Sequence, residues 1–189
     1  IYGGKLYAVI NCSHFVEVMD ASTARHIATI SIPNCRYLEF HDGFAYVSSY
    51  AGPVEIDPNA RIGYVAKVDT ATLKVIDQCI VGYQPEEMAI AGGKLYVANS
   101  GGYRVPNYDR TVSVIDLATF SETKKIEVAI NLHRIEKDRY GNLYVSSRGD
   151  YYDTGSKTYI IDTSTDLVTD VLHLLPNSNM TLAGDSLYV

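Results

Sequence analysis

One short apolar motif occurs five times in this chain at a nearly constant period. The successive tyrosines of the motif are 39, 50, 48 and 44 residues apart. A repeat of this length is typical of architectures in which each unit stacks against its neighbours. The repeat constrains the fold more than any other feature, and it contains no catalytic motif. The five copies are Lys5-Leu6-Tyr7-Ala8-Val9, Phe44-Ala45-Tyr46-Val47, Lys94-Leu95-Tyr96-Val97, Asn142-Leu143-Tyr144-Val145 and Ser186-Leu187-Tyr188-Val189.

A second marker, Asp-x-x-Thr, recurs in step with the tyrosines. It begins at Asp20, Asp69, Asp116 and Asp162. An Asp carboxylate accepts hydrogen bonds from backbone N–H groups two residues on, and a Thr hydroxyl supports the same turn. Each copy lies between two short apolar segments, so we interpret these aspartates as structural turn residues and not as catalytic acids.

The segments between the two markers predict four short strands in each unit. Glycines precede every tyrosine strand, as expected for hairpin turns. No stretch has the period and caps of a helix. Several tyrosine strands are apolar on both faces, which is typical of strands covered on two sides. We therefore predict an all-β fold, a β-propeller of four-stranded antiparallel blades, as one domain over residues 1–189. The repeat units cover approximately 1–40, 41–90, 91–137 and 138–183, and residues 184–189 begin a further blade.

Two segments give the repeat a family resemblance. Gly93 to Asn99, followed by Val112 to Thr119, resembles the YVTN-type, YncE-like β-propeller repeat, and Val81 to Pro85 resembles its Gly-x-x-Pro tail. Other units depart from this pattern, since Ser48-Ser49 and Ser146-Ser147 replace Thr-Asn. The resemblance implies about seven blades and a location outside the cytoplasm, in the periplasm or at the cell surface.

The order of the predicted strands suggests a partial ring. The chain begins and ends with the same strand type, which gives about four blades and one extra strand. We therefore expect these residues to be part of a longer, seven-bladed propeller.

Composition excludes several function classes. The chain of 189 residues has 22 acidic and 16 basic residues and a net charge of −6. Nucleic-acid binding requires clustered positive charge, so we expect no nucleic-acid partner. No apolar run approaches the length of a transmembrane helix. Cys12, Cys35 and Cys79 match no zinc signature, so we expect small apolar residues there and neither a metal nor another cofactor.

Three long connections are the predicted binding surface. They follow the tyrosine strands in the second, third and fourth units, and strand alternation places them on one face of the molecule. Tyr and Arg recur in them, and these residue types anchor interfaces because they bury a large area and still form hydrogen bonds. The alternative is that the tyrosines only pack neighbouring loops together. The candidate binding residues are Tyr50, Arg61, Tyr103, Arg104, Tyr108, Arg148, Tyr151 and Tyr152.

A second set of connections reaches the same face nearer to the axis. Arg36, His133 and Arg134 lie in them and could form a basic mouth for an anionic group. The alternative for His133 is a structural hydrogen-bonding role. The same connections carry the polar side chains of Asn34, Gln84, Glu86, Asn177 and Asn179.

Two function hypotheses follow. The first is a non-catalytic binding or scaffold propeller whose loop face binds a protein, a peptide or a glycan, and it assigns no catalytic residue. The second is a propeller enzyme, such as a lactonase or a lyase, with a site in the central channel. That enzyme would use His133 or a carboxylate among Glu39, Glu87 and Glu136.

Overall fold

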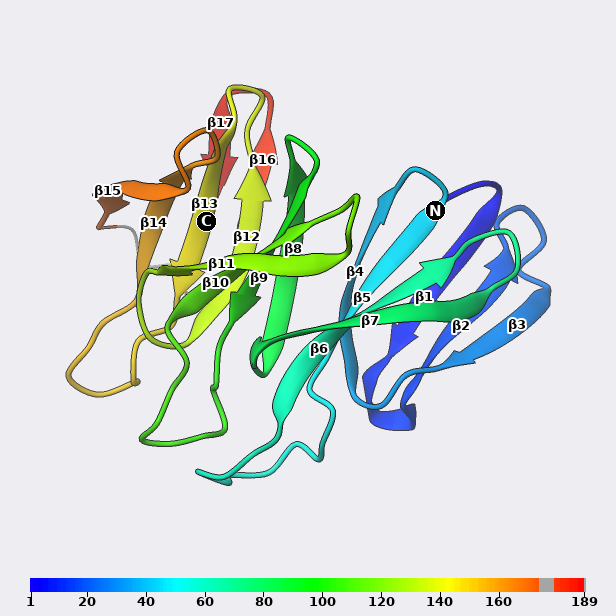
Figure 1. Ribbon diagram of the computed structural model, residues 1–189, viewed down its shortest axis with the longest axis horizontal. Helices are drawn as coiled ribbons and strands as arrows, with labels where there is room; N and C mark the ends of the chain where they lie inside the picture. Colours follow the sequence, from blue (N-terminus) through cyan, green and yellow to red (C-terminus); the bar gives the residue numbers. More distant parts are fainter. Residues whose placement is uncertain (174–178, 189) are drawn as a thin grey trace.

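The computed structural model describes residues 1–173 and 179–188, so Asn177 and Val189 lie outside the described residues. The fold is all-β, with about 58% of residues in strands. Within the described ranges the only helical segment is one 3-10 turn, Asn11–Ser13. Five antiparallel sheets lie next to one another and fan out from their first strands (Figure 1). The predicted all-β architecture of four-stranded antiparallel sheets is confirmed.

Each complete sheet is a simple meander in chain order. The first sheet has three strands, the next three sheets have four strands each, and the last has two among the described residues. The bounds are β1 Lys5–Ile10, β2 Phe15–Asp20, β3 His26–Ser31; β4 Cys35–His41, β5 Phe44–Ser49, β6 Ile62–Asp69, β7 Lys74–Tyr83; β8 Pro85–Ala91, β9 Lys94–Asn99, β10 Thr111–Asp116, β11 Ser121–Glu127; β12 Leu132–Lys137, β13 Asn142–Ser147, β14 Lys157–Asp162, β15 Leu167–Leu172; and β16 Thr181–Ala183, β17 Ser186–Tyr188.

The sheets and the repeat units are out of phase by one strand. A unit counted from its tyrosine strand ends on the first strand of the next sheet, so residues 41–90 include β5 to β7 and most of β8. Each unit therefore bridges two sheets. This overlap ties neighbouring sheets together through the chain as well as through packing.

The Asp-x-x-Thr segments form the expected turns. The Asp69 carboxylate accepts hydrogen bonds from the Ala71 and Thr72 backbone N–H groups at 2.9 and 2.7 Å, and the other three copies use the same kind of carboxylate contact. The Thr70 N–H then donates to the Gly43 carbonyl at 3.0 Å, on the neighbouring hairpin turn. One end of each sheet is thus closed by short, internally bonded turns.

The tyrosine strands are the packed centres of the sheets. In β9, Leu95 and Val97 contact the sheet before, while Tyr96 and Ala98 contact the sheet after. Tyr46 and Tyr96 are 1% and 0% exposed. Alternate side chains of one strand therefore fill two different cores, as predicted for strands covered on both faces.

Not every repeated tyrosine is equally buried, and strand β11 begins earlier in the sequence than its apolar pattern predicts. Tyr188 on β17 is 59% exposed, so that copy of the motif is not packed as a core residue. The sequence from Lys125 to Ala129 predicts the fourth strand of its sheet, whereas the observed strand, β11, begins four residues earlier, at Ser121. Phe120, at φ 49°, closes the preceding turn, so the strand starts directly after it.

The first strands of the sheets form the inner edge of the molecule. β4, β8 and β12 contact one another in sequence, although they belong to three different sheets. Side chains that are far apart in the chain, such as Arg36, Glu86 and His133, are therefore brought together near the loop ends of these strands.

No helix among the described residues has the length and apolar character needed to cross a bilayer.

Candidate functional site

Buried amide side chains fix the long loops to the inner edge. An amide residue immediately precedes each of the strands β4, β8 and β12: Asn34, Gln84 and Asn131. Their φ angles are positive, at 49°, 50° and 55°, and each residue is at most 2% exposed. Gln84 Oε1 accepts the Tyr103 N–H at 2.7 Å, and Asn131 Nδ2 donates to the Gly149 carbonyl at 2.9 Å. Each amide holds the long loop of its own sheet, so these loops start from a rigid base.

A repeated serine strengthens the same base. Ser100 Oγ donates to the Gln84 carbonyl at 2.9 Å, and Ser147 Oγ donates to the Ile130 carbonyl at 2.7 Å. Each hydroxyl also accepts the backbone N–H two residues on, from Gly102 or Gly149. These serines end or follow the tyrosine strands, and their contacts explain why a small hydroxyl residue recurs there.

A pocket of about 480 Å³ opens between the three long loops. Five of the predicted binding residues line it: Tyr103, Tyr108, Arg148, Tyr151 and Tyr152. The rest of the lining is Ile56, Glu86, Gly102 and Val105. The pocket thus draws on the loops β5–β6, β9–β10 and β13–β14, and on the inner strand β8.

The pocket combines exposed aromatic rings with a buried acid. Tyr151 and Tyr152 are 66% and 90% exposed, and Tyr103 is 37% exposed. Glu86, by contrast, is almost completely buried. The tyrosines therefore offer free surface to a ligand, whereas Glu86 belongs to the foundation under them.

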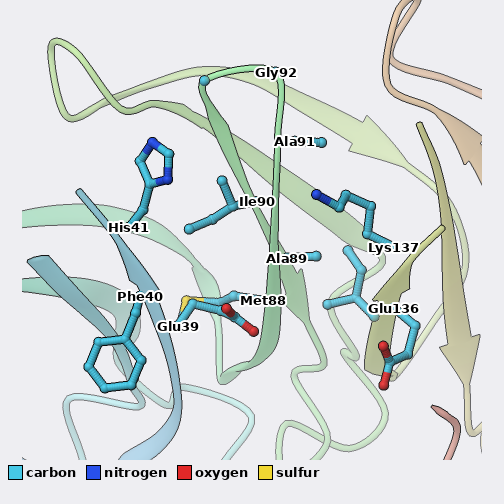
Figure 2. Close-up of a pocket in the computed structure, with 12 residues that line it drawn as sticks. Glu39, Phe40, His41, Met88, Ala89, Ile90, Ala91, Gly92, Glu136 and Lys137 are labelled. Carbon is cyan, nitrogen blue, oxygen red and sulfur yellow. The ribbon is translucent and has the colours of Figure 1, made fainter. Parts of the chain in front are cut away.

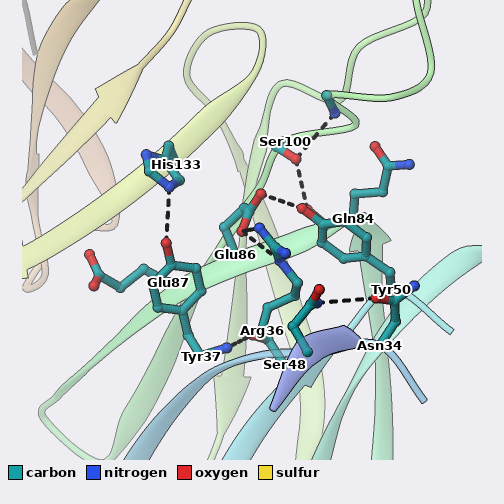
Figure 3. A network of polar contacts seen from close by, with 12 residues as sticks. Asn34, Arg36, Tyr37, Ser48, Tyr50, Gln84, Glu86, Glu87, Ser100 and His133 are labelled. Carbon is teal, nitrogen blue, oxygen red and sulfur yellow. Dashed lines mark hydrogen bonds and ion pairs between the residues drawn. The ribbon is translucent and has the colours of Figure 1, made fainter. Parts of the chain in front are cut away.

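The buried carboxylate of Glu86 is fully engaged (Figure 3). Arg36 donates to Glu86 Oε2 from Nε and Nη2, both at 3.2 Å, and the Tyr50 hydroxyl donates to Glu86 Oε1. The Arg36 guanidinium also lies 4.7 Å from the centre of the Tyr50 ring. Burial raises the pKa of Tyr50, so its hydroxyl stays protonated as the donor. Tyr50 is consequently a structural support, only 2% exposed, and not a surface contact.

Arg134 has a comparable ion pair one strand further along. Its Nη1 donates to Glu87 Oε1 at 2.8 Å, and its Nη2 donates to the Asn179 side chain. The predicted basic mouth of Arg36, His133 and Arg134 is therefore balanced by two carboxylates, because each arginine has its own glutamate.

His133 is a neutral hydrogen-bond acceptor at this site. Its Nε2 lies 2.8 Å from Arg148 Nη2 and 2.9 Å from the Tyr37 hydroxyl. A guanidinium can only donate, so Nε2 accepts and the ring proton lies on Nδ1. Burial and the charges of Arg148, Arg134 and Arg36 lower the pKa of His133 to about 3. The interpretation of His133 as a structural hydrogen-bonding residue fits this geometry.

Arg148 is the one cation in the lining of the pocket, and no described carboxylate forms an ion pair with it. Its only described hydrogen bond is the one to His133, and no acid lies within ion-pair distance among residues 1–173 and 179–188. Asp150 is the nearest acid in the same loop by sequence, but its carboxylate accepts the Tyr152 and Thr154 N–H groups. The positive charge of Arg148 is thus presented at the pocket.

The β13–β14 loop holds one of the pocket tyrosines in an unfavourable backbone conformation. Tyr151 has a φ of 69°, which is uncommon for a bulky residue. Gly149 makes the tight closure possible, since an added Cβ would lie 1.8 Å from the Thr154 carbonyl oxygen. Strain of this kind persists where surrounding contacts impose it and is often found at binding sites.

Two other predicted residues lie beside the pocket. Arg104 stacks over Tyr83 at 3.6 Å from the ring centre and donates to the Asn107 carbonyl at 2.8 Å, so it shapes its own loop. Arg61 lines a separate hollow of about 260 Å³ under the β5–β6 loop, together with Tyr50. The structure therefore separates the predicted set into pocket residues and supporting residues.

The opposite end of the inner strands carries a second pocket, of about 450 Å³ (Figure 2). Glu39, Glu136 and Lys137 line it, together with His41 and the turn after β8. Burial, followed by the charge of Glu87, raises the pKa of Glu39 to about 7. Burial also raises the pKa of Glu136 and of Glu87. Of the carboxylates of the enzyme hypothesis, Glu39 and Glu136 thus lie at this end, whereas Glu87 pairs with Arg134 and lies near His133.

The cysteines and acids of the described part of the chain form no metal centre. Across residues 1–173 and 179–188, no three His, Cys, Asp or Glu side chains are arranged to hold a metal ion. Cys35 and Cys79 are buried, as expected for small apolar residues, whereas Cys12 is exposed, and all three are free thiols.

Sequence patterns do not identify every residue of this site. Tyr37, Ile56 and Val105 were not predicted, and Glu86 was noted only as a polar residue of the inner connections. Tyr37 carries a usable signal, because it follows Arg36 at the start of an inner strand. Ile56 and Val105 carry none, since isolated aliphatic residues in long loops are common.

Comparisons with known proteins support the fold and leave the activity open. No known family profile and no curated protein sequence matches the chain. Among solved structures it is similar to Kuenenia stuttgartiensis hydrazine synthase, with a TM-score of 0.79 and 19% identity over 94% of this chain and 48% of that one. It is also similar to the dihydro-heme d1 dehydrogenase NirN in complex with DHE, with a TM-score of 0.62 and 12% identity over 89% of this chain and 35% of that one. The chain therefore spans half or less of each neighbour, and at these identities the likeness concerns the propeller-like fold alone.

Proposed function

We propose that this chain is a binding module whose loop face accepts a segment of a protein, a peptide or a glycan. The observation that carries the proposal is the pocket of about 480 Å³ between three loops that buried amides and serines hold in place. A rigid base with exposed aromatic rings limits the entropy lost on binding, because few side chains must be ordered.

The composition of the pocket supports a binding role. Tyr103, Tyr108, Tyr151 and Tyr152 supply apolar rings with a hydroxyl at the end of each, which suits an interface. Below them, Glu86 already accepts hydrogen bonds from Arg36, and His133 already accepts one from Arg148, so these contacts hold the pocket in shape.

A selection experiment tests this proposal. Peptide and glycan libraries would be screened against the purified chain, and the affinity of each hit would be measured for the Y108A and Y151A/Y152A variants. We expect the pocket variants to weaken binding by at least tenfold, since truncation of a central aromatic residue commonly costs about 2 kcal/mol. Hits that bind all variants equally would place the binding surface elsewhere and contradict the proposal.

A second candidate function rests on the pocket around Glu39. A carboxyl group with a pKa of about 7 in a cavity can act as a general acid or base at neutral pH. The enzyme would be a lactonase or a lyase, and this choice rests only on analogy with other propellers. Screening the wild-type chain and E39Q with lactone and uronate substrates tests this function, and activity that is unchanged in E39Q would remove Glu39 from the reaction.

The resemblance to YVTN-type repeats supports three finer proposals. The sheets would belong to a ring of about seven blades, the ring would be of the YVTN type, and the protein would work outside the cytoplasm. Determination of the full-length mass and fractionation of cells that express the protein test these points directly.

A further inference from the structure

We infer that the pocket recognises an acidic peptide segment, in which a carboxylate binds Arg148 and an adjacent apolar side chain contacts the tyrosines. This inference rests on the proposed binding function and specifies the ligand for the same pocket.

One of the three arginines around His133 lacks a carboxylate partner among the described residues. Arg36 is paired with Glu86 at 3.2 Å and Arg134 is paired with Glu87 at 2.8 Å. Arg148 has no such carboxylate among the described residues. A half-buried guanidinium that faces a pocket is stabilised by an incoming anion, because opposite charge compensates its partial loss of water.

The hydrogen bonds of Arg148 position it for this role. The guanidinium has five N–H donors, and only Nη2 has a described partner, His133 Nε2 at 2.8 Å. That contact orients the guanidinium and leaves an edge with two parallel N–H groups available. A carboxylate matches such an edge with two hydrogen bonds, which a single neutral acceptor cannot do.

His133 remains satisfied whether or not Arg148 moves toward a ligand. The Tyr37 hydroxyl lies 2.9 Å from the same Nε2 atom, so it can donate to the ring alone. A neutral imidazole has only one acceptor lone pair, and two donors compete for it in the free protein. Movement of Arg148 toward a carboxylate therefore leaves no buried acceptor unpaired.

The walls of the pocket favour a peptide over a sugar. Tyrosine rings and the aliphatic Ile56 and Val105, which are 75% and 39% exposed, form most of the lining. Sugar rings need several planar polar side chains for their hydroxyl groups. In this lining the charged groups are Glu86, which is already engaged, and Arg148. An apolar side chain next to a carboxylate fits these contacts better.

The experiment uses small probes that separate charge from shape. N-acetyl-leucine, its uncharged analogue N-acetyl-leucinamide, and glucuronate would each be titrated into the isotope-labelled chain, with NMR signals of Tyr108, Tyr151 and Tyr152 as the readout. We expect N-acetyl-leucine to bind at least about tenfold more tightly than the amide, as a charge-assisted hydrogen bond predicts. Glucuronate should bind more weakly than N-acetyl-leucine.

Two variants complete the test. R148M should remove the difference between N-acetyl-leucine and its amide, while R110M, which changes an exposed arginine outside the pocket, should retain it. Amide binding equal to that of the acid, or an unchanged difference in R148M, would overturn the inference. Tighter binding of glucuronate, or no shift of pocket signals with any probe, would also overturn it.

The outcomes separate this inference from the proposed function. If library ligands lose affinity in Y151A/Y152A but not in R148M, the pocket binds a ligand and the acidic-peptide inference is wrong. If library ligands are insensitive to both sets of variants, the proposed function itself is wrong.

Discussion

The repeated tyrosines and the loop tyrosines show two uses of one residue type in the same molecule. Tyr46 and Tyr96 lie in the cores between sheets at 1% and 0% exposure, whereas Tyr151 and Tyr152 extend from a loop at 66% and 90% exposure. The Tyr96 hydroxyl donates to Asp166 in the next sheet at 2.7 Å. The period therefore indicates which tyrosines hold the scaffold, and departures from it indicate which are free to contact a partner.

The largest effect is expected from truncation of a scaffold tyrosine. Y96A should lower the free energy of unfolding by about 3–5 kcal/mol, because it leaves a cavity between two sheets and removes one of the hydrogen bonds to Asp166. Y152A is the matched control and should change it by less than about 0.5 kcal/mol. Urea denaturation measures both, and equal effects of the two substitutions would remove the distinction between scaffold and loop tyrosines.

Substitution of Glu86, which supports the pocket from below, should have the next largest effect on the free energy of unfolding. E86A leaves the Arg36 guanidinium without its carboxylate and the Tyr50 hydroxyl without an acceptor. We therefore expect it to lower the free energy of unfolding by about 3 kcal/mol. E127A breaks an exposed ion pair with Arg110 and should cost less than about 1 kcal/mol. A small effect of E86A in denaturation would show that the pocket does not depend on this network.

The two ends of the inner strands should respond to pH in opposite ways. The folded-state pKa of Glu39 is raised to about 7, so the folded chain holds the extra proton and stability falls as the pH rises from about 4.5 to 7. The folded-state pKa of His133 is lowered to about 3, so stability falls as the pH drops from about 6.5 towards 3.

Substitution of Glu39 or of His133 isolates the contribution of that side chain to the pH dependence of stability. As the pH rises from 5 to 7, the free energy of unfolding should fall less for E39Q than for the wild type. We expect the two to differ by on the order of 1–2 kcal/mol, after allowance for partial solvent screening. H133Q should lose less stability than the wild type as the pH falls below about 6. Parallel pH curves for the wild type and both variants, measured by denaturation, would contradict these assignments.

The smallest effect on stability should come from relief of strain in the β13–β14 loop. Tyr151 has a φ of 69°, and glycine adopts this conformation without strain, so Y151G should be as stable as the wild type or more stable by up to about 1 kcal/mol. Binding should nevertheless weaken, because a ring of the pocket is lost. A clear loss of stability in Y151G would show that the ring packs the loop.

The sequence predicts the fold well because the repeat is expressed in every unit. The tyrosine strand, the Asp-x-x-Thr turn and the glycine turn each have a local physical cause, and the five tyrosine motifs and four Asp-x-x-Thr turns make the pattern unmistakable. The three long loops are also predictable, since they appear as extra length at one position of the period. These loops contain the predicted residues Tyr103, Tyr108, Arg148, Tyr151 and Tyr152, and the structure brings them into one pocket.

The roles within that face could not be predicted. Tyr50 and Tyr151 both lie in long loops that follow tyrosine strands, yet one is buried against Glu86 and the other is exposed. Likewise, Arg36 and Arg148 look equally basic, but only the first is paired with a carboxylate in the described structure. Such differences depend on contacts between sheets, here between residues that are 36 and 50 positions apart in sequence, which periodicity does not record.

The most direct test of the central claim compares folding and binding in one variant. Y151A/Y152A should have a free energy of unfolding within about 0.5 kcal/mol of the wild type and should bind the library-selected ligand at least about tenfold more weakly. The opposite result, a chain destabilised by several kcal/mol that still binds its ligand with wild-type affinity, would show that the loop tyrosines hold the scaffold and that the binding site lies elsewhere.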